Sequence, residues 1–174
     1  MEKIILAGGC FWCTEAVFSD VPGVLSIRSG FSGGHIKNPA YREVCQGRTG
    51  HAECIELKYD SQALSLNVIL DLFFKTHDPT TLNRQGHDVG THYRSAIFFT
   101  SEEQRLTIES CIKNLEEKRI YANPIVTEIM AFEEFYPAEV EHQEYYQNNP
   151  FQPYCQFVIK PKLKIKNEHL AKNS

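Results

Sequence analysis

The chain has 174 residues, of which 42% are apolar and 23% are charged. This length and composition are typical of one globular domain with a substantial core, and we predict a single domain over residues 1–174. The net charge is −4, but residues 160–172 carry five Lys and one Glu, which leaves −8 on the first 159 residues. This basic tail, approximately residues 160–174, has no arginine and no Phe, Trp or Tyr. We therefore predict a solvated edge or frayed terminus there, and no surface for nucleic acid or membrane.

A short apolar run at residues 4–7 follows Glu2 and Lys3. It is too short for a signal peptide or a membrane span, so we expect a cytoplasmic protein. Thiols stay reduced in the cytoplasm, where cysteines are more often free thiols, catalytic groups or ligands than structural disulfides. Redox chemistry is therefore our leading hypothesis. The six cysteines are Cys10, Cys13, Cys45, Cys54, Cys111 and Cys155.

Hydrophobic periodicity and cap residues predict the secondary structure in chain order. Strands are expected over residues 3–7, 24–31, 52–59, 94–100 and 125–132. Helices are expected over residues 11–20, from Ser65 to just before Asp78, from the Ser101 capping box past Leu115, and from Pro137 to about Tyr146. A long loop from about Gly33 to Gly50 separates two of the strands, and such loops in compact domains are usually functional.

The first six elements follow the order strand, helix, strand, strand, helix, strand. This is the order of the ferredoxin-like, or split βαβ, unit. We predict an α+β fold, a two-layer sandwich with a ferredoxin-like βαββαβ core and an irregular C-terminal tail that begins at Asn149-Pro150.

Cys10 follows two glycines at the point where the first strand is expected to become a helix. The first amides of a helix lack partners within it, and the peptide dipoles leave partial positive charge there, which favours an anion. A thiolate is such an anion, and this placement is known to lower the pKa of a cysteine into the reactive range. Cys10 is therefore our first candidate nucleophile.

Cys10 and Cys13 have the spacing of a thioredoxin-like dithiol in a cytosolic protein. That disulfide oxidoreductase is one alternative for the function. The two aromatic residues between them, Phe11 and Trp12, argue against it, because they add apolar surface suited to an apolar substrate group. The alternative interpretation, that both rings belong to the core, has equal weight.

Glu53 begins the apolar face of the strand at residues 52–59, since alternation places it with Ile55, Leu57 and Tyr59. A carboxyl group at the edge of an apolar face loses hydration, which raises its pKa. Such a group holds a proton near pH 7 and can deliver it. An exposed strand-end glutamate is the ordinary alternative.

Two further combinations are weaker. His51-x-Glu53 has the H-x-E spacing of zinc deaminases, but the C-x-x-C lies upstream and follows glycine instead of proline. Cys45, Cys54 and His51 lack tight ligand spacing, so a zinc-binding interaction module is only an alternative. A hydrolytic triad of Cys10, His92 and Asp88 has nothing in the sequence that sets its geometry.

Motifs from four parts of the chain together resemble the peptide methionine sulfoxide reductases of the A type. They occur in the family's order and span most of the chain, from Gly9 to the Tyr154-Cys155 tail. The motifs are Gly9-Cys10-Phe11-Trp12-Cys13-Thr14-Glu15, Asn38-Pro39-Ala40-Tyr41, Gly47-Arg48-Thr49-Gly50-His51-Ala52-Glu53 and Asp88-Val89-Gly90-Thr91-His92-Tyr93-Arg94-Ser95.

The resemblance implies that Cys10 attacks the sulfoxide sulfur, so that methionine leaves and a sulfenic acid remains on Cys10. It also implies a specificity for the S epimer, because each enzyme type reduces one epimer. The remaining roles follow by position in the motifs. They are the methyl-group pocket for Phe11 and Trp12, the proton donor for Glu53, hydroxyls on the sulfoxide oxygen for Tyr41 and Tyr93, and a supporting polar partner for Asp88.

The resemblance further implies that Cys155, on a mobile tail, resolves the sulfenic acid and that thioredoxin then reduces the enzyme. Two positions depart from the family pattern: Cys13 stands where glycine is common, and His92 where glutamine is usual. Cys13 is therefore a rival resolving residue, favoured by its closeness to Cys10. The neutral imidazole of His92 can replace an amide in hydrogen bonding.

The expected substrates are oxidised proteins or free methionine sulfoxide. We expect a monomer that binds neither nucleic acid nor membrane. No metal and no organic cofactor is expected, because thiols supply the electrons.

Overall fold

The computed structural model describes residues 1–172 as a mixed α/β protein built on an open sheet. The sheet has the strand order β7-β6-β1-β3-β2-β8, in which β6 and β7 are parallel and the other neighbours antiparallel. The strands are β1 (Glu2–Gly8), β2 (Val24–Ser32), β3 (Ala52–Tyr59), β6 (Ser95–Phe99), β7 (Glu128–Ala131) and β8 (Tyr136–Pro137), with a separate hairpin of β4 (Arg84–Gln85) and β5 (Asp88–Val89). The helices are α1 (Phe11–Phe18), α2 (Tyr41–Cys45), α3 (Leu66–Lys75), α4 (Glu102–Glu117), α5 (Tyr145–Asn148) and α6 (Lys160–Lys172).

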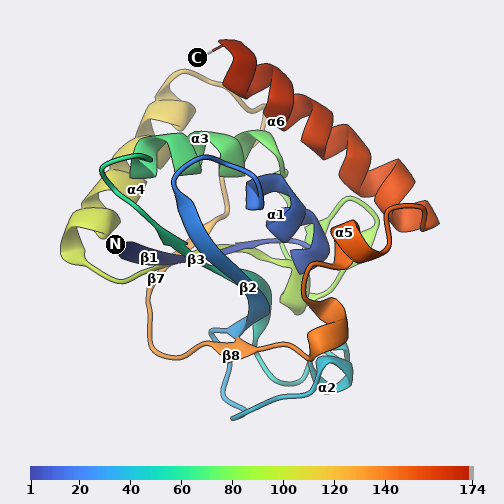
Figure 1. The fold of residues 1–174 in the computed structure, drawn as a ribbon. Coiled ribbons are helices and arrows are strands. Elements are labelled where there is room, and N and C mark those ends of the chain that lie inside the picture. The colour runs from blue at the N-terminus through green and yellow to red at the C-terminus, as the bar shows by residue number, and fades with distance from the viewer. Residues whose placement is uncertain (173–174) are drawn as a thin grey trace.

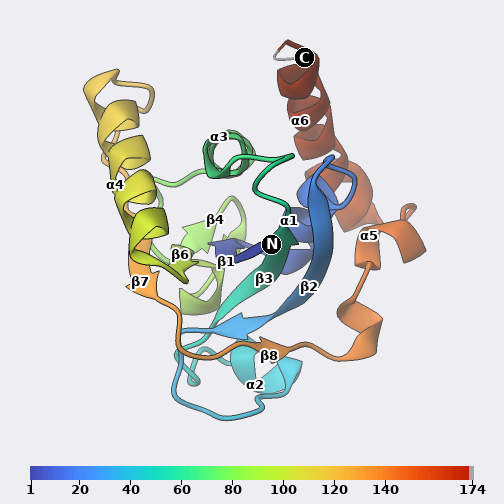
Figure 2. The same ribbon diagram turned by 60° about the vertical axis from the view of Figure 1, so that its left-hand side comes forward.

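Helices α1, α3 and α4 cover one face of the sheet, and α6 packs against α1 and α3 on the same side (Figure 1 and Figure 2). Alternate residues of the strands point into this layer, among them Leu6 of β1 and Ile55 of β3, where they meet Phe11 of α1 and Leu70 of α3. All four side chains are fully buried. The main core therefore lies between the sheet and the helices. Within residues 1–172, no helix combines the length and the apolar character that a membrane span needs.

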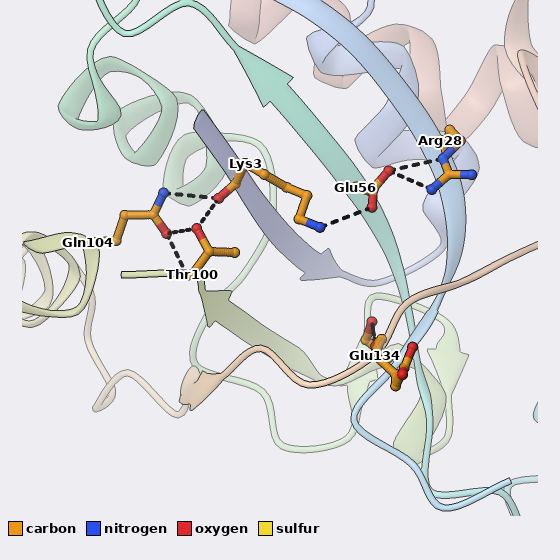
Figure 3. A network of polar contacts seen from close by, with 7 residues as sticks. Lys3, Arg28, Glu56, Thr100, Gln104 and Glu134 are labelled. Carbon is orange, nitrogen blue, oxygen red and sulfur yellow. Dashed lines mark hydrogen bonds and ion pairs between the residues drawn. The ribbon is translucent and has the colours of Figure 1, made fainter. Parts of the chain in front are cut away.

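The opposite face of the sheet is covered by the chain after β7, where Phe132 and Phe135 pack on a smaller cluster. Figure 3 shows how charges are arranged on this face. The buried carboxylate of Glu56 is paired with Arg28 at 2.8 Å and with Lys3 at 3.7 Å, so that three adjacent strands are joined by side chains. A buried carboxylate is tolerated when it is paired in this way.

The middle of the chain agrees with prediction. The structure confirms the predicted strand at residues 52–59, including its alternation, since Glu53 and Ile55 face the helices while Cys54 faces the smaller cluster. The predicted loop at residues 33–50 contains the short helix α2. The predicted strand at residues 125–132 is shorter, because only β7 pairs with β6.

The predicted helix at residues 137–146 is wrong. Pro137 lies in the edge strand β8, opposite Gly30 of β2, and is followed by a 3₁₀ turn (Val140–His142) and by α5. An edge strand tolerates proline because its missing N–H removes no hydrogen bond from the sheet interior.

The predicted irregular tail and frayed basic terminus are also wrong. A π-helix (Cys155–Ile159) leads directly into α6, and only residues 173–174 of the predicted tail lie outside the described part of the chain. Leu163, Lys166 and Leu170 form a helical stripe toward the body of the protein, and Lys166 is 2% exposed and pairs with Asp20. A lysine in the buried stripe concealed the helical periodicity, since the sequence there reads as alternating lysine and apolar residues.

The π-helix accounts for a proline inside this C-terminal helix. Pro161 has no N–H to donate, and its ring would clash with a carbonyl one turn earlier in an ordinary α-helix. The amide of Lys160 instead donates to Cys155 O, five residues back, which widens the turn just before the proline. The helix therefore continues through Pro161, and Cys155 is fixed on an ordered segment.

This order predicts the reactivity of Cys155 toward thiol reagents. Cys155 is completely buried whereas Cys45 is exposed. In the reduced native protein we expect a small alkylating reagent to label Cys45 quickly and Cys155 only after unfolding in denaturant, as measured by mass spectrometry of peptides over time. Labelling of Cys155 as fast as that of Cys45 would contradict an ordered C-terminal helix.

Candidate functional site

The candidate site lies where β1 ends and α1 begins. Gly9 has φ +95°, in the left-handed region, and a Cβ there would lie 2.7 Å from the Gln85 side chain, so glycine is required. Cys10 follows as the N-cap, and the amides of Cys13 and Thr14 donate to Cys10 O at 3.1 and 3.5 Å. The structure therefore confirms the predicted placement of Cys10 at a helix N-terminus.

The pKa of Cys10 differs from the prediction. Burial raises the pKa of the Cys10 thiol well above its ordinary value, and the neighbouring Cys13 and Glu53 raise it further. Cys13 shows the opposite shift: a hydrogen bond from Cys10 and the charge of Lys162 lower its pKa to about 7. Desolvation at Cys10 outweighs the helix terminus, so Cys13 carries the thiolate of this pair in the substrate-free protein.

Tyr154 connects Cys13 to the β4–β5 hairpin. Its hydroxyl lies 3.5 Å from Cys13 Sγ and donates to Asp88 Oδ2 at 2.7 Å. Burial raises the pKa of Tyr154, as do the adjacent thiols, so the hydroxyl remains protonated. Asp88 thus fixes the direction of the Tyr154 hydroxyl. From the sequence, Tyr154 was noted only as the neighbour of Cys155, because its partners at the site come from distant segments.

Glu53 reaches the same helix terminus from β3. Its Oε1 accepts a hydrogen bond of 3.2 Å from the Phe11 amide, while its buried Oε2 has no partner among the described residues. Glu53 is 0% exposed, and this burial raises its pKa to about 8, with a further contribution from the charge of Asp88. The carboxyl group is therefore neutral at pH 7, as predicted for a proton donor.

Tyr41 and Tyr93 lie close enough to Glu53 to sense its charge. Burial raises the pKa of both phenols, and the Glu53 carboxylate raises them further. Both hydroxyls therefore remain donors throughout the neutral range. Tyr41 is the first residue of α2, and Tyr93 ends a 3₁₀ turn (Thr91–Tyr93). The long loop and the turn after the β4–β5 hairpin therefore each contribute one phenol.

The two aromatic residues after Cys10 have different environments. Phe11 is fully buried in the core and lies 5.9 Å from the ring of Tyr41. Trp12 is partly exposed; it stacks on Tyr145 at 3.7 Å and its Nε1 donates to His142 Nδ1 at 3.3 Å. His142 and Tyr145 were not predicted as site residues, because their segment was predicted as a regular helix. An amphipathic aromatic surface at Trp12 thus borders the thiol pair.

Two alternatives from the sequence, a zinc site at His51 and Glu53 and the hydrolytic triad, find no support in this geometry. Both ring nitrogens of His51 are engaged by the loop, with Nδ1 accepting from Gly34 N at 3.0 Å and Nε2 bonded to Ile36 O at 2.7 Å, so His51 is not free to hold zinc beside Glu53. Asp88 bonds Tyr154, and the Nδ1 of His92 has no partner within the described residues. A hydrolytic triad with Cys10 is therefore not formed.

Comparison with known proteins identifies the family. The model of the family described as peptide methionine sulfoxide reductase matches residues 2–174. The chain belongs to this family. It is 50% identical over 163 residues to peptide methionine sulfoxide reductase MsrA of Trichodesmium erythraeum, which covers 94% of this chain and 92% of that protein. The match favours a sulfoxide reductase over the thioredoxin-like alternative.

Solved structures agree with the family and the fold. Mxr1 from Saccharomyces cerevisiae in reduced form is 34% identical, with a TM-score of 0.82 over 88% of each chain. Mxr1 in complex with Trx2 is 25% identical, with a TM-score of 0.58, covering 83% of this chain and 84% of that one. The reduced form is the more similar of the two, in agreement with the free thiols of this structure.

The raised pKa of Glu53 predicts a pH dependence of stability. The unfolded chain ionises this carboxyl near its ordinary value of 4.5, whereas the folded protein keeps the proton up to about 8. The folded state therefore binds more protons in that window, and its stability falls as pH rises, by up to about 1.4 kcal/mol per pH unit. Glu53→Gln lacks this ionisation, so its free energy of unfolding relative to wild type should increase from pH 5 to 8.

Urea unfolding of both proteins at several pH values measures this difference. The other titrating groups are the same in both proteins, so their contributions to the pH dependence of the free energy of unfolding cancel in the difference. A difference that is constant across the range would contradict the raised pKa.

Proposed function

We propose that the protein reduces methionine S-sulfoxide, free or in proteins, to methionine. The Cys10 sulfur attacks the sulfoxide sulfur, the S–O bond breaks, and the oxygen ends on Cys10 as a sulfenic acid. A thiol and a sulfoxide thus give a sulfenic acid and a thioether with no net change in protons. The observation that carries the proposal is the neutral, buried Glu53 carboxyl beside the helix terminus that holds Cys10.

The proposed proton donors surround the position of the sulfoxide oxygen. Attack on a sulfoxide requires that its oxygen be protonated as the S–O bond breaks, and Glu53 is the group with a pKa suited to this transfer. Tyr41 and Tyr93 donate hydrogen bonds to the same oxygen, which their raised pKa values support. Glu53 can take up the proton of the Cys10 thiol after it has delivered its own.

The apolar part of the substrate is proposed to lie against Phe11 and Trp12. The Trp12 ring is held by Tyr145 and His142, so its orientation is fixed before substrate binds. A methyl group packed on a fixed aromatic surface positions the sulfoxide sulfur toward Cys10.

Substitution of the two central residues tests the first step. Cys10→Ser should abolish release of methionine from a sulfoxide peptide, because a hydroxyl is a much weaker nucleophile than a thiol and has no sulfur to accept the oxygen as a sulfenic acid. Glu53→Gln should fold but slow single-turnover release by roughly 10² to 10⁴. In wild type this rate should fall as pH rises through about 8, where Glu53 loses its proton.

Trp12→Ala is the comparison variant, since it alters binding without removing the acid or the nucleophile. It should lower the specificity constant without moving the midpoint near pH 8. Unchanged single-turnover release in Glu53→Gln would exclude Glu53 as the proton donor.

Recycling is proposed to involve both candidate resolving cysteines. Cys13 has the lowered pKa and accepts a hydrogen bond from Cys10, whereas Cys155 lies in the same apolar cluster but is held on the π-helix. The expectation of Cys155 as the direct resolver rested on a mobile tail, which this helix replaces. Burial raises the pKa of Cys155 and the charge of Cys13 raises it further, so Cys13 interacts both with Cys155 and with Cys10. We therefore propose the order Cys10, Cys13, Cys155.

The proposed exchange follows that order. The Cys13 thiolate attacks the Cys10 sulfenic sulfur, so that a disulfide forms and water leaves. Cys155 then attacks the Cys13 sulfur, which releases the Cys10 thiol and leaves a Cys13–Cys155 disulfide for an external dithiol to reduce. Thioredoxin is the proposed reductant, supported by the Mxr1 complex with Trx2.

Disulfide mapping after one equivalent of sulfoxide tests this order. Mass spectrometry of wild type should show Cys13–Cys155, and Cys155→Ser should stop at Cys10–Cys13. Cys13→Ser should accumulate sulfenic acid on Cys10, and Cys111→Ser should behave as wild type. A Cys10–Cys155 disulfide formed at the wild-type rate in Cys13→Ser would make Cys155 the direct resolver.

We further propose a single-domain, monomeric, cytoplasmic enzyme that needs no organic cofactor. The order β6-β1-β3-β2, with all neighbours antiparallel, supports a ferredoxin-like core that β7 and β8 extend at its two edges.

A further inference from the structure

Three potential metal ligands converge beside the thiol pair. One ligand atom each from Cys45, Glu53 and His92 lies within 4.8 Å of the others. Cys45 ends α2, Glu53 lies near the start of β3, and His92 lies in the 3₁₀ turn after β5. Three segments that are distant in sequence thus meet at one point.

Two of these side chains are buried with unused hydrogen-bonding atoms. Glu53 Oε2 and His92 Nδ1 have no partner among the described residues, and the side chains are 0% and 5% exposed. Buried polar atoms of this kind indicate a missing partner, for example an ion. The backbone holds His92 in place, because Gly90 has φ +146° and a Cβ there would lie 2.5 Å from the imidazole ring.

We propose that Cys45, Glu53 and His92 form a binding site for Zn²⁺. Thiolate, imidazole and carboxylate are the three ligand types that Zn²⁺ uses in proteins, and three protein ligands leave the fourth position open. Bonds of roughly 2.0 to 2.3 Å in a tetrahedron separate ligand atoms by about 3.5 Å, so atoms that lie within 4.8 Å of one another need to approach by up to about 1.3 Å. The exposed Cys45 gives the ion access from solvent.

The ligand charges match this ion. The deprotonated thiol and carboxyl together neutralise Zn²⁺, and His92 binds as the neutral imidazole. Binding therefore releases the protons of Cys45 and Glu53. A hard cation such as Mg²⁺ prefers an octahedron of oxygen ligands and does not fit a site with one thiol and one imidazole.

One consequence rests on the proposed function. Zn²⁺ at this site occupies the carboxyl group that would protonate the sulfoxide oxygen, so the ion and the substrate exclude each other. The site would then make the reductase reversibly sensitive to free zinc.

Direct binding tests the site without reference to activity. Co²⁺, which reports tetrahedral thiolate coordination by its visible and charge-transfer absorption, is added to the reduced protein and then displaced with Zn²⁺. We expect one ion per chain, and at least a tenfold loss of affinity in Cys45→Ser and in His92→Gln. Cys111→Ser is the matched control with a cysteine removed elsewhere, and Cys10→Ser removes the competing thiol pair; both should bind as wild type.

The opposite pattern would overturn the proposal. Loss of the absorption in Cys10→Ser with full retention in Cys45→Ser would assign the ion to Cys10 and Cys13. Absence of thiolate-to-cobalt absorption in wild type would exclude the site altogether. Circular dichroism of each variant confirms that a loss of binding does not reflect unfolding.

Single-turnover release of methionine tests the consequence, since it needs no external thiol that would bind zinc. Zn²⁺ should slow wild type and Cys111→Ser, with relief at higher sulfoxide concentration, and should leave Cys45→Ser unaffected. Equal inhibition of Cys45→Ser would contradict action through this site. If the protein binds Co²⁺ as expected but Zn²⁺ does not slow its turnover, the metal site stands and the role of Glu53 as proton donor is contradicted.

Discussion

The hydrogen bond from the Phe11 amide to Glu53 Oε1 is the contact on which the site depends. It joins the N-terminus of α1 to the start of β3, and β2 and the long loop at residues 33–50 lie between these two elements in the chain. The bond is possible because alternation places Glu53 on the helix-facing side of the strand. The same contact holds an uncharged carboxyl group next to the backbone that positions Cys10.

Burial sets the protonation states around this contact. It raises the pKa of Glu53, of Cys10 and of the two phenols, so each keeps its proton at neutral pH. Cys13 is the exception, because Cys10 and Lys162 stabilise its thiolate. The site therefore holds its proton donors and its thiolate on separate residues, an arrangement suited to proton delivery in one step and thiolate attack in the next.

Local sequence signals located Cys10 and Glu53, the residues proposed as nucleophile and acid. The glycines before Cys10 and the alternation through Glu53 depend on neighbouring residues alone, and the structure has both as predicted. Tyr154 and Lys162, which both act on Cys13, lie more than a hundred residues away from it in the sequence, and periodicity does not encode such contacts. The C-terminal helix was missed because Lys166 occupies its buried stripe, where an ion pair with Asp20 replaces an apolar contact.

The proposed chemistry depends on the protonation state of Glu53, and infrared spectroscopy measures this state directly. The difference spectrum between wild type and Glu53→Gln reports the carbonyl stretch of a protonated carboxyl group and follows it with pH. We predict that this band is present at pH 7 and disappears with a midpoint of about 8. A midpoint near 4.5, the ordinary value for glutamate, would contradict it.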